Sequence, residues 1–267
     1  MQKKMEISKI MQKKIEELIS KERRMDERGL KEYRELSVKT NVSAKAEGSA
    51  WVKLGDTEVI AGIKLDAIEP YRDSPDEGVL AVGAELSPLS SSNFESGPPQ
   101  IQAIELARII DRGIRNSEFI DFKKLCIKEK EKVWSVALDI YPVNEGGSLI
   151  DASFIASVIA LKEAFFPEYK DDEVQYGKLS NKKLPLKEMP INVTVYKIGN
   201  KFVLDPVSGE EDASNTRLSF TITYPGETIN AMQKTGQELS EEEILEMESI
   251  ALKEGKKLHA KVLSLIK

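Results

Sequence analysis

The chain has 267 residues, of which 40% are hydrophobic and 31% are charged, and its formal net charge is −6 at pH 7. These values describe a soluble globular protein long enough for two small domains, with no overall attraction to nucleic acid. The single cysteine, Cys126, and the single histidine, His259, exclude an intrachain disulfide, a thiolate metal cluster and a multi-histidine metal site.

Residues 5 to 20 repeat apolar side chains at helical spacing between charged ones, which predicts an amphipathic helix lying on the body of the protein. The N-terminus opens charged and has no secretory signal, and no apolar run is long enough to span a membrane. We therefore expect a cytoplasmic protein without a membrane segment. Residues 23 to 36 are charged and predict an extended connector.

Alternation and turn residues then predict three strands, at residues 50–54, 58–65 and 79–86, the first two joined by a hairpin at Gly55-Asp56-Thr57. Polar loops are expected at 70–78 and 87–100. Helical spacing starts at Ile101, and a strand from Trp134 to Ile140 is expected to end at Pro142. The next helix, 149–166, is apolar almost all round and is expected at the centre of the fold.

The second half repeats this alternation of strands and helices. Residues 167–189 hold prolines, acids and lysines and predict a linker or a long excursion from the fold. Strands are expected at 191–196, 201–204 and 218–224, and Ser240-Glu241-Glu242-Glu243 predicts a capping box that opens a long final helix containing a solvated His259. We predict a first unit over residues 1–186, which includes the N-terminal helix, and a second unit over 187–267.

The turn Gly146-Gly147-Ser148 resembles a phosphate-binding loop without cations. A helix N-terminus offers N–H groups and a partial positive charge to an anion, but Leu149 and Asp151 follow where a phosphate site would need a cation or a hydroxyl. The other interpretation is a tight turn that lets the helix pack closely. Both remain open from the sequence.

Arg108, Arg112 and Arg115 share one side of the helix that begins at 101. Three guanidinium groups in a row could bind successive phosphates of single-stranded RNA. The competing interpretation is salt bridging with Glu105, Asp111 and Glu118. A second cluster, Asp205, Glu210, Glu211 and Asp212, could hold Mg²⁺, but a solvated acidic turn with Arg217 as its counter-charge explains it without a metal.

Several segments together resemble the RNase PH-type phosphorolytic exoribonucleases: the connector Arg24–Gly29, the strand pair over 47–61 and the helix after Gly146-Gly147. The resemblance covers residues 24 to 260. It implies an α+β fold of two tandem β-α domains of the ribosomal protein S5 domain 2-like type, here with an added N-terminal amphipathic helix. It also implies six-membered rings that cleave the 3′ end of RNA with inorganic phosphate.

Three departures from that family concern catalysis. Gly97-Pro98-Pro99 stands where active subunits carry adjacent arginines, Leu149-Ile150-Asp151 follows the glycine turn, and Asn215-Thr216-Arg217 stands where an active subunit has its catalytic aspartate. The pattern is similar to the non-catalytic ring subunits of archaeal exosomes, and no cofactor or metal is expected.

The resemblance implies that the chain alternates with a catalytic RNase PH-like subunit, three copies of each, in a ring capped by subunits with S1 and KH or zinc-ribbon domains. It also implies that the chain shapes its partner's active site and binds RNA through Arg112 first, with Arg108 and Arg115 beside it. One alternative is an active exoribonuclease that uses relocated carboxylates at Asp205, Glu211 or Asp212. Another is an unrelated two-domain binding protein.

Overall fold

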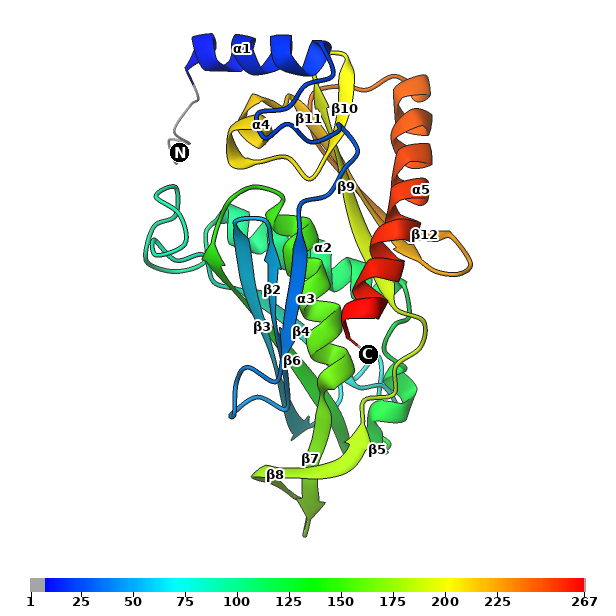
Figure 1. The fold of residues 1–267 in the computed structure, drawn as a ribbon. Helices are drawn as coiled ribbons and strands as arrows, with labels where there is room; N and C mark the ends of the chain where they lie inside the picture. The colour runs from blue at the N-terminus through cyan, green and yellow to red at the C-terminus, as the bar shows by residue number, and fades with distance from the viewer. Residues whose placement is uncertain (1–7, 267) are drawn as a thin grey trace.

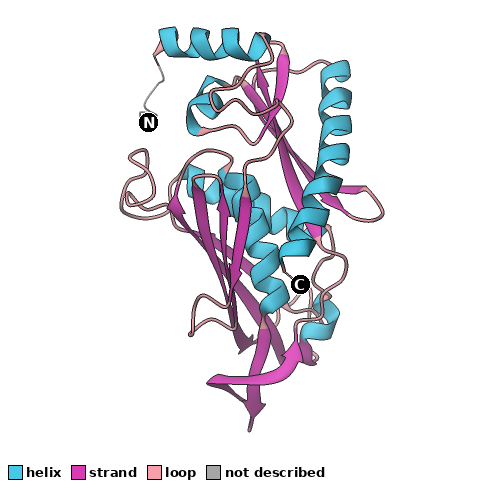
Figure 2. Cartoon of the chain, viewed as in Figure 1, coloured by secondary structure: helices cyan, strands magenta, loops and turns pink. Residues whose placement is uncertain are grey.

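The computed structural model describes residues 8–266 and shows an α+β protein with two main sheets (Figures 1 and 2). The first sheet has the order β1-β2-β3-β6-β4, with β5 paired to β6, and its pairs are antiparallel except for β4 beside β6. Its strands are β1 Leu36–Thr40, β2 Gly48–Leu54, β3 Thr57–Ile68, β4 Val79–Ala84, β5 Cys126–Lys128 and β6 Lys132–Asn144.

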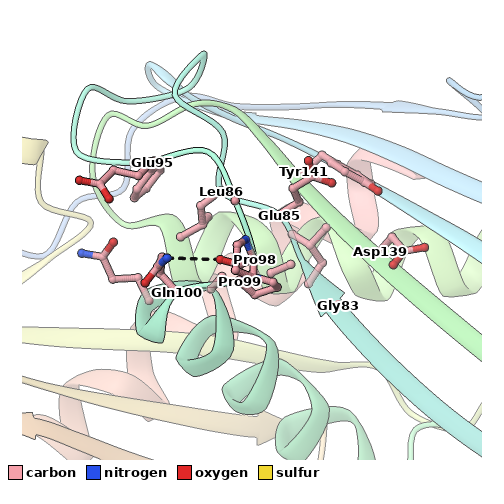
Figure 3. Close-up of a pocket in the computed structure, with 15 residues that line it drawn as sticks. Gly83, Glu85, Leu86, Glu95, Pro98, Pro99, Gln100, Asp139 and Tyr141 are labelled. Carbon is pink, nitrogen blue, oxygen red and sulfur yellow. Dashed lines mark hydrogen bonds between the residues drawn. The ribbon is translucent and has the colours of Figure 1, made fainter. Parts of the chain in front are cut away.

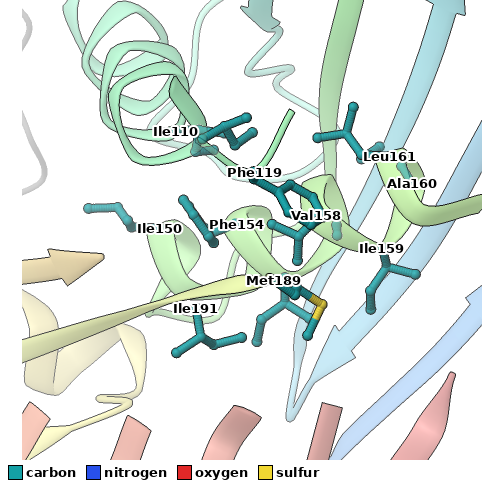
Figure 4. Close-up of a cluster of buried hydrophobic side chains, with 14 of the residues drawn as sticks. Ile110, Phe119, Ile150, Phe154, Val158, Ile159, Ala160, Leu161, Met189 and Ile191 are labelled. Atoms are coloured by element: carbon teal, nitrogen blue, oxygen red, sulfur yellow. The ribbon is translucent and has the colours of Figure 1, made fainter. Parts of the chain in front are cut away.

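Two helices lie against this sheet, α2 over Ile101–Asn116 and α3 over Leu149–Glu163, and the 3-10 turn η1 at Phe122–Leu125 precedes β5. Every residue of α3 from Ile150 to Leu161 is buried, because the helix packs on β2 and β3 on one side and on β9 (Pro190–Ile198) of the second sheet on the other. Figure 4 shows Phe154 and Val158 of α3 between Ile110 of α2 and Ile191 of β9. The predicted central helix is therefore confirmed.

The second sheet is wholly antiparallel, in the order β10-β9-β11-β12. The helix α5 packs on β9 and β11. Ser240 caps α5, since its Oγ accepts from the N–H of Glu243 while the Glu243 carboxylate accepts from the N–H of Ser240, as the capping box predicted. The elements are β9 Pro190–Ile198, β10 Lys201–Leu204, α4 Ser208–Ala213, β11 Thr216–Thr223, β12 Thr228–Gly236 and α5 Glu241–Leu265.

Of the two alternatives for residues 167–189, a linker is wrong for most of that length and a long excursion fits the structure. Residues Phe165–Lys170 (β7) and Glu173–Lys183 (β8) form a two-stranded antiparallel ribbon, which projects at the bottom of Figure 1. The side chains of β8 are mostly exposed and polar, so this strand carries no apolar alternation that a sequence could show. The strand β7 begins with Phe165 and the buried Phe166, which the sequence assigned to the end of the preceding apolar helix. The Trp134 ring, 5.0 Å from that of Phe166 and 5.8 Å from that of Tyr169, holds the ribbon to β6.

Smaller differences concern strand and helix ends. The strand β6 continues through Pro142 to Asn144, and the register shifts beside the proline: Glu58 and Val59 of β3 face Asn144 and Pro142, so Val143 is the extra residue of a bulge in β6. The helix α3 stops at Glu163 rather than 166, and β4 stops at Ala84 rather than 86. The strands β1 and β12, both at sheet edges, have no counterpart among the predicted strands.

The N-terminal helix α1 is described over Lys9–Ser20, and residues 5–7 of the predicted helix lie outside the described part. Its buried side chains Ile15 and Ile19 form a small core with Ile198, Val203 and Ala213. The helix thus lies on the second sheet, although its sequence precedes the first (Figure 1); the boundary between units at 186/187 stays a prediction. Within residues 8–266, no helix is long and apolar enough to cross a membrane.

Candidate functional site

The glycine turn between β6 and α3 has its N–H groups occupied by side chains of the same protein. The N–H of Gly146 donates to Thr57 Oγ1 at 3.2 Å and that of Gly147 to Glu145 Oε1 at 3.0 Å. The N–H of Ser148 donates to Glu211 Oε2 at 2.8 Å. Two carboxylates therefore stand where a bound anion would accept hydrogen bonds from a helix N-terminus.

The same turn is also a packing joint. Gly147 has φ +94°, and a Cβ there would overlap the carbonyl oxygen of Pro206. Its own carbonyl oxygen accepts from Thr57 Oγ1 at 2.6 Å and from Arg34 Nη2 at 2.9 Å. Glycine is required here because the loop after β10 lies directly against the turn.

Asp151 does not act as the repelling carboxylate that its position in the sequence suggests. Its side chain is buried and accepts hydrogen bonds from Asn192 and Thr194 of β9 and from the Tyr33 hydroxyl, at 2.7–3.2 Å. Burial raises the pKa of Asp151 to about 6. The carboxylates at the turn are instead Glu145 and Glu211. The contact of Glu211 with Ser148 spans 63 residues and has no local signature in the sequence.

The acidic loop after β10 is not the solvated turn that the sequence predicted. Asp205 and Glu210 are both fully buried. Arg34 binds Asp205 at 2.6 Å and Arg24 binds Glu210 at 2.5 Å, with Arg28 reaching Asp205 at 3.2 Å. All three arginines come from the N-terminal connector, so these acids are neutralised by a segment more than 170 residues away in the chain. No group of three or more His, Cys, Asp or Glu within residues 8–266 is arranged to hold a metal ion.

Arg217 of β11 supplies the counter-charge expected of it, in a wider network. Its guanidinium binds Glu105 of α2 at 3.0 Å and Glu211 of α4 at 3.4 Å. The recess beside it, about 140 Å³, is lined by these two acids and by Glu145 and Asp212. Burial, and then the charge of Glu211, raise the pKa of Glu145. The recess is thus acidic, although it lies where the resemblance places a phosphate site.

A larger recess of about 410 Å³ lies beyond the ends of β4 and β6, under the loop that carries Pro98 and Pro99 (Figure 3). The resemblance implies arginines in this loop for active subunits. Here the charged lining residues are Glu85, Glu95 and Asp139. Burial, together with the charge of Glu85, raises the pKa of Asp139. This recess also repels anions.

The three arginines of α2 are exposed on one side of the helix. Of the salt bridges considered for them, only Arg115 with Asp111 forms, at 2.8 Å. Glu105 instead binds Arg217, and Glu118 binds Lys187. The guanidinium of Arg112 donates to Gln233 Oε1 at 2.6 Å, and that of Arg108 has no hydrogen bond or ion pair with residues 8–266. Two of the three cations are therefore available to an anion.

Residues 32–167 match the first domain of the 3′ exoribonuclease family, and residues 188–254 match its second domain. The chain belongs to the 3′ exoribonuclease family. This confirms the resemblance to RNase PH and the two tandem domains of its fold, and removes the interpretation as an unrelated binding protein. The β7–β8 ribbon falls largely between the two matched segments, outside the family's shared domains.

Relatives within the family are similar to this chain in sequence and structure over most of its length. The exosome complex component Rrp42 of Methanosarcina mazei is 44% identical over 242 residues, which is 90% of this chain and 89% of the relative. A chain of the Archaeoglobus fulgidus exosome with RNA bound to the active site superposes with a TM-score of 0.87 at 41% identity, covering 94% of this chain and 97% of that one. A chain of an archaeal exosome core gives 0.84 at 37% identity, covering 95% and 96%.

Proposed function

We propose that this member of the 3′ exoribonuclease family is a non-catalytic ring subunit of an archaeal exosome, which structures the active site of a catalytic RNase PH-like partner and binds RNA during 3′-to-5′ phosphorolysis. The names of its relatives and its likeness to archaeal exosome chains support the assembly. The proposal that the chain is not catalytic depends on one observation, the hydrogen bond that the Glu211 carboxylate accepts from the N–H of Ser148.

That carboxylate opposes phosphate binding in two ways. An incoming phosphate would have to displace a charge-assisted hydrogen bond of 2.8 Å. It would then lie beside the charges of Glu145 and Glu211, with Arg217 as the cation lining that recess and already bound to two acids. A phosphorolytic enzyme needs phosphate bound as its nucleophile, so the chain lacks the first requirement of the reaction.

The alternative of relocated catalytic carboxylates has less support. Asp205 is buried and accepts from Arg34 and Arg28, while Glu211 accepts from Ser148, Tyr196 and Arg217. These acids fix the contact between the connector, α4 and the glycine turn. A carboxylate held by these contacts is not free to turn toward a substrate or a metal. Asp212, the third acid of this alternative, is half-buried and lines the same recess as Glu211 and Arg217.

For RNA, the α2 surface of Arg108, Arg112 and Arg115 is the proposed binding site, with Arg112 first. Guanidinium groups bind the phosphate backbone without regard to sequence, and arginines on a rigid helix place the strand for a reaction in the neighbouring subunit. The proposed complex is cytoplasmic and has three copies of each ring subunit. It carries cap subunits with S1 and KH or zinc-ribbon domains.

The decisive experiment compares the chain alone with the assembled ring. We expect the purified chain to release no nucleoside diphosphate from single-stranded RNA and phosphate, and co-expression with an archaeal catalytic RNase PH-like subunit to give an active ring of six chains by native mass measurement. The matched control is the ring whose partner lacks its catalytic aspartate, which should be inactive. Phosphate-dependent trimming by the chain alone would refute the proposal.

A further inference from the structure

A third recess, of about 240 Å³, lies between the second half of α2 and the strand β12. Arg112 and Asn116 of α2 line one side, and Asn230, Met232 and Gln233 of β12 line the other. Its lining contains no carboxylate, whereas the recesses beside Arg217 and under Pro98 are both acidic. In a chain with a net charge of −6, this hollow can accept a neutral part of a polyanion without repulsion from carboxylates in its walls.

The polar side chains at the floor of this recess are hydrogen-bonded to one another and to their buried neighbours. Asn192, Ser219 and Thr221 are 0–3% exposed. Thr221 Oγ1 donates to Asn192 Oδ1 at 3.2 Å, and the Asn192 amide donates to Asp151 at 2.8 Å. A satisfied and rigid floor does not need water or an ion to complete it.

At the rim, in contrast, hydrogen-bond donors and acceptors remain available to a ligand. Asn116 is exposed, and its Oδ1 accepts no hydrogen bond from residues 8–266. Its amide makes only a long contact, 3.4 Å, with the carbonyl oxygen of Asn230. Met232 is 56% exposed beside it. Neutral amides offer both donors and acceptors, and a thioether offers a flexible, polarisable contact for a ring; these are groups that suit an unstacked base.

The charges around the recess favour the phosphate of a nucleotide at the rim and its base inside the recess. The helix α2 ends at Asn116, so the partial negative charge of its carbonyl end lies beside the part of the recess that Asn116 lines and disfavours phosphate there. Arg112, one turn earlier, carries the positive charge, and its hydrogen bond to Gln233 fixes the guanidinium at the rim. A phosphate held by Arg112 brings its own base to the neutral hollow.

We propose that the recess between α2 and β12 receives one base of the single-stranded RNA whose backbone Arg112 binds. The inference rests on the proposed RNA-binding function of α2 and adds an uncharged site for a base beside the arginines that bind the backbone. The lining of mixed donors and acceptors makes this site tolerant of base identity.

The test uses the assembled ring in phosphate-free buffer, so that RNA is bound but not cleaved. Two fluorescent probes of equal length are titrated: an oligoadenylate and a ribose-phosphate oligomer without bases. The double variant Asn116→Ala, Met232→Ala should bind oligoadenylate about fivefold more weakly, the effect of about one lost net hydrogen bond, and bind the abasic oligomer as the unmodified ring does. Arg112→Ala should weaken both probes, and Asn181→Ala, on the exposed strand β8, should change neither.

The outcomes separate the two proposals. If Arg112→Ala weakens both probes but the double variant binds oligoadenylate normally, the base site is refuted and the arginine surface stands. Equal weakening of both probes by the double variant also refutes the base site, since it would show a backbone contact. If Arg112→Ala changes neither probe, both proposals fail.

Discussion

At the scale of single residues, the buried acid Asp151 of α3 links the two domains through hydrogen bonds, and no lysine or arginine within residues 8–266 forms an ion pair with it. It lies in the first turn of α3 and accepts from Asn192 and Thr194 of β9. These donors and the helix N-terminus favour its ionised form, but burial is the larger effect and raises the pKa to about 6. Asp151, at the contact between the two domains, therefore exchanges its proton at about pH 6.

Because the folded state holds this proton more tightly than the unfolded chain does, Asp151 favours folding at low pH. Its contribution is complete below 3.8, the ordinary pKa of an aspartate in an unfolded chain, and is lost as pH rises through about 6. Relative to Asp151→Asn, the unmodified chain should lose on the order of 3 kcal/mol of unfolding free energy between those limits. Urea unfolding of both chains from pH 4 to pH 7 measures this difference. Asp73→Asn, in an exposed loop, serves as control, and parallel curves for Asp151→Asn would contradict the prediction.

At the scale of elements, the connector before β1 fastens the N-terminal helix to the second domain through buried ion pairs. Arg24 and Glu210 are both 0% exposed in their side chains and lie 2.5 Å apart. Glu210→Ala should cost about 3–5 kcal/mol in unfolding free energy, because it leaves a buried guanidinium without its partner charge. Glu22→Ala, which breaks the exposed pair with Lys201, should cost less than about 1 kcal/mol. Thermal unfolding compares them, and equal losses would show that burial does not set the cost.

The elements also show what the sequence could predict. The hairpin at Gly55 and the helices at 101–116 and 149–163 have strong local patterns, and the structure has them. The strand β8 and the edge strand β12 are polar on exposed faces, so their apolar period is missing. The sequence wrongly predicts solvated acids at 205 and 210 because their arginines come from a distant segment, and no local pattern reports such a pairing.

At the scale of the whole molecule, RNA binding by an acidic chain depends on where its few free cations lie. The affinity of a protein for single-stranded RNA falls as salt rises. A plot of the logarithm of the binding constant against the logarithm of the salt concentration has a negative slope, which steepens by about 0.7 for each phosphate that the protein neutralises. Arg108 and Arg112 are not paired with acids among residues 8–266, whereas Arg115 already binds Asp111 at 2.8 Å. The three positions should therefore contribute unequally.

We expect Arg108→Ala and Arg112→Ala each to make the salt slope of the assembled ring shallower by about 0.7, and Arg115→Ala to change it less. Fluorescence anisotropy with a short single-stranded RNA, in phosphate-free buffer at several salt concentrations, measures the slope. Arg72→Ala removes an exposed arginine far from α2 in the sequence and controls for net charge alone. If Arg72→Ala lowers the slope as much as Arg112→Ala, general attraction accounts for binding. If Arg115→Ala has the largest effect, RNA must displace Asp111, and the ion pair on α2 becomes part of the binding step.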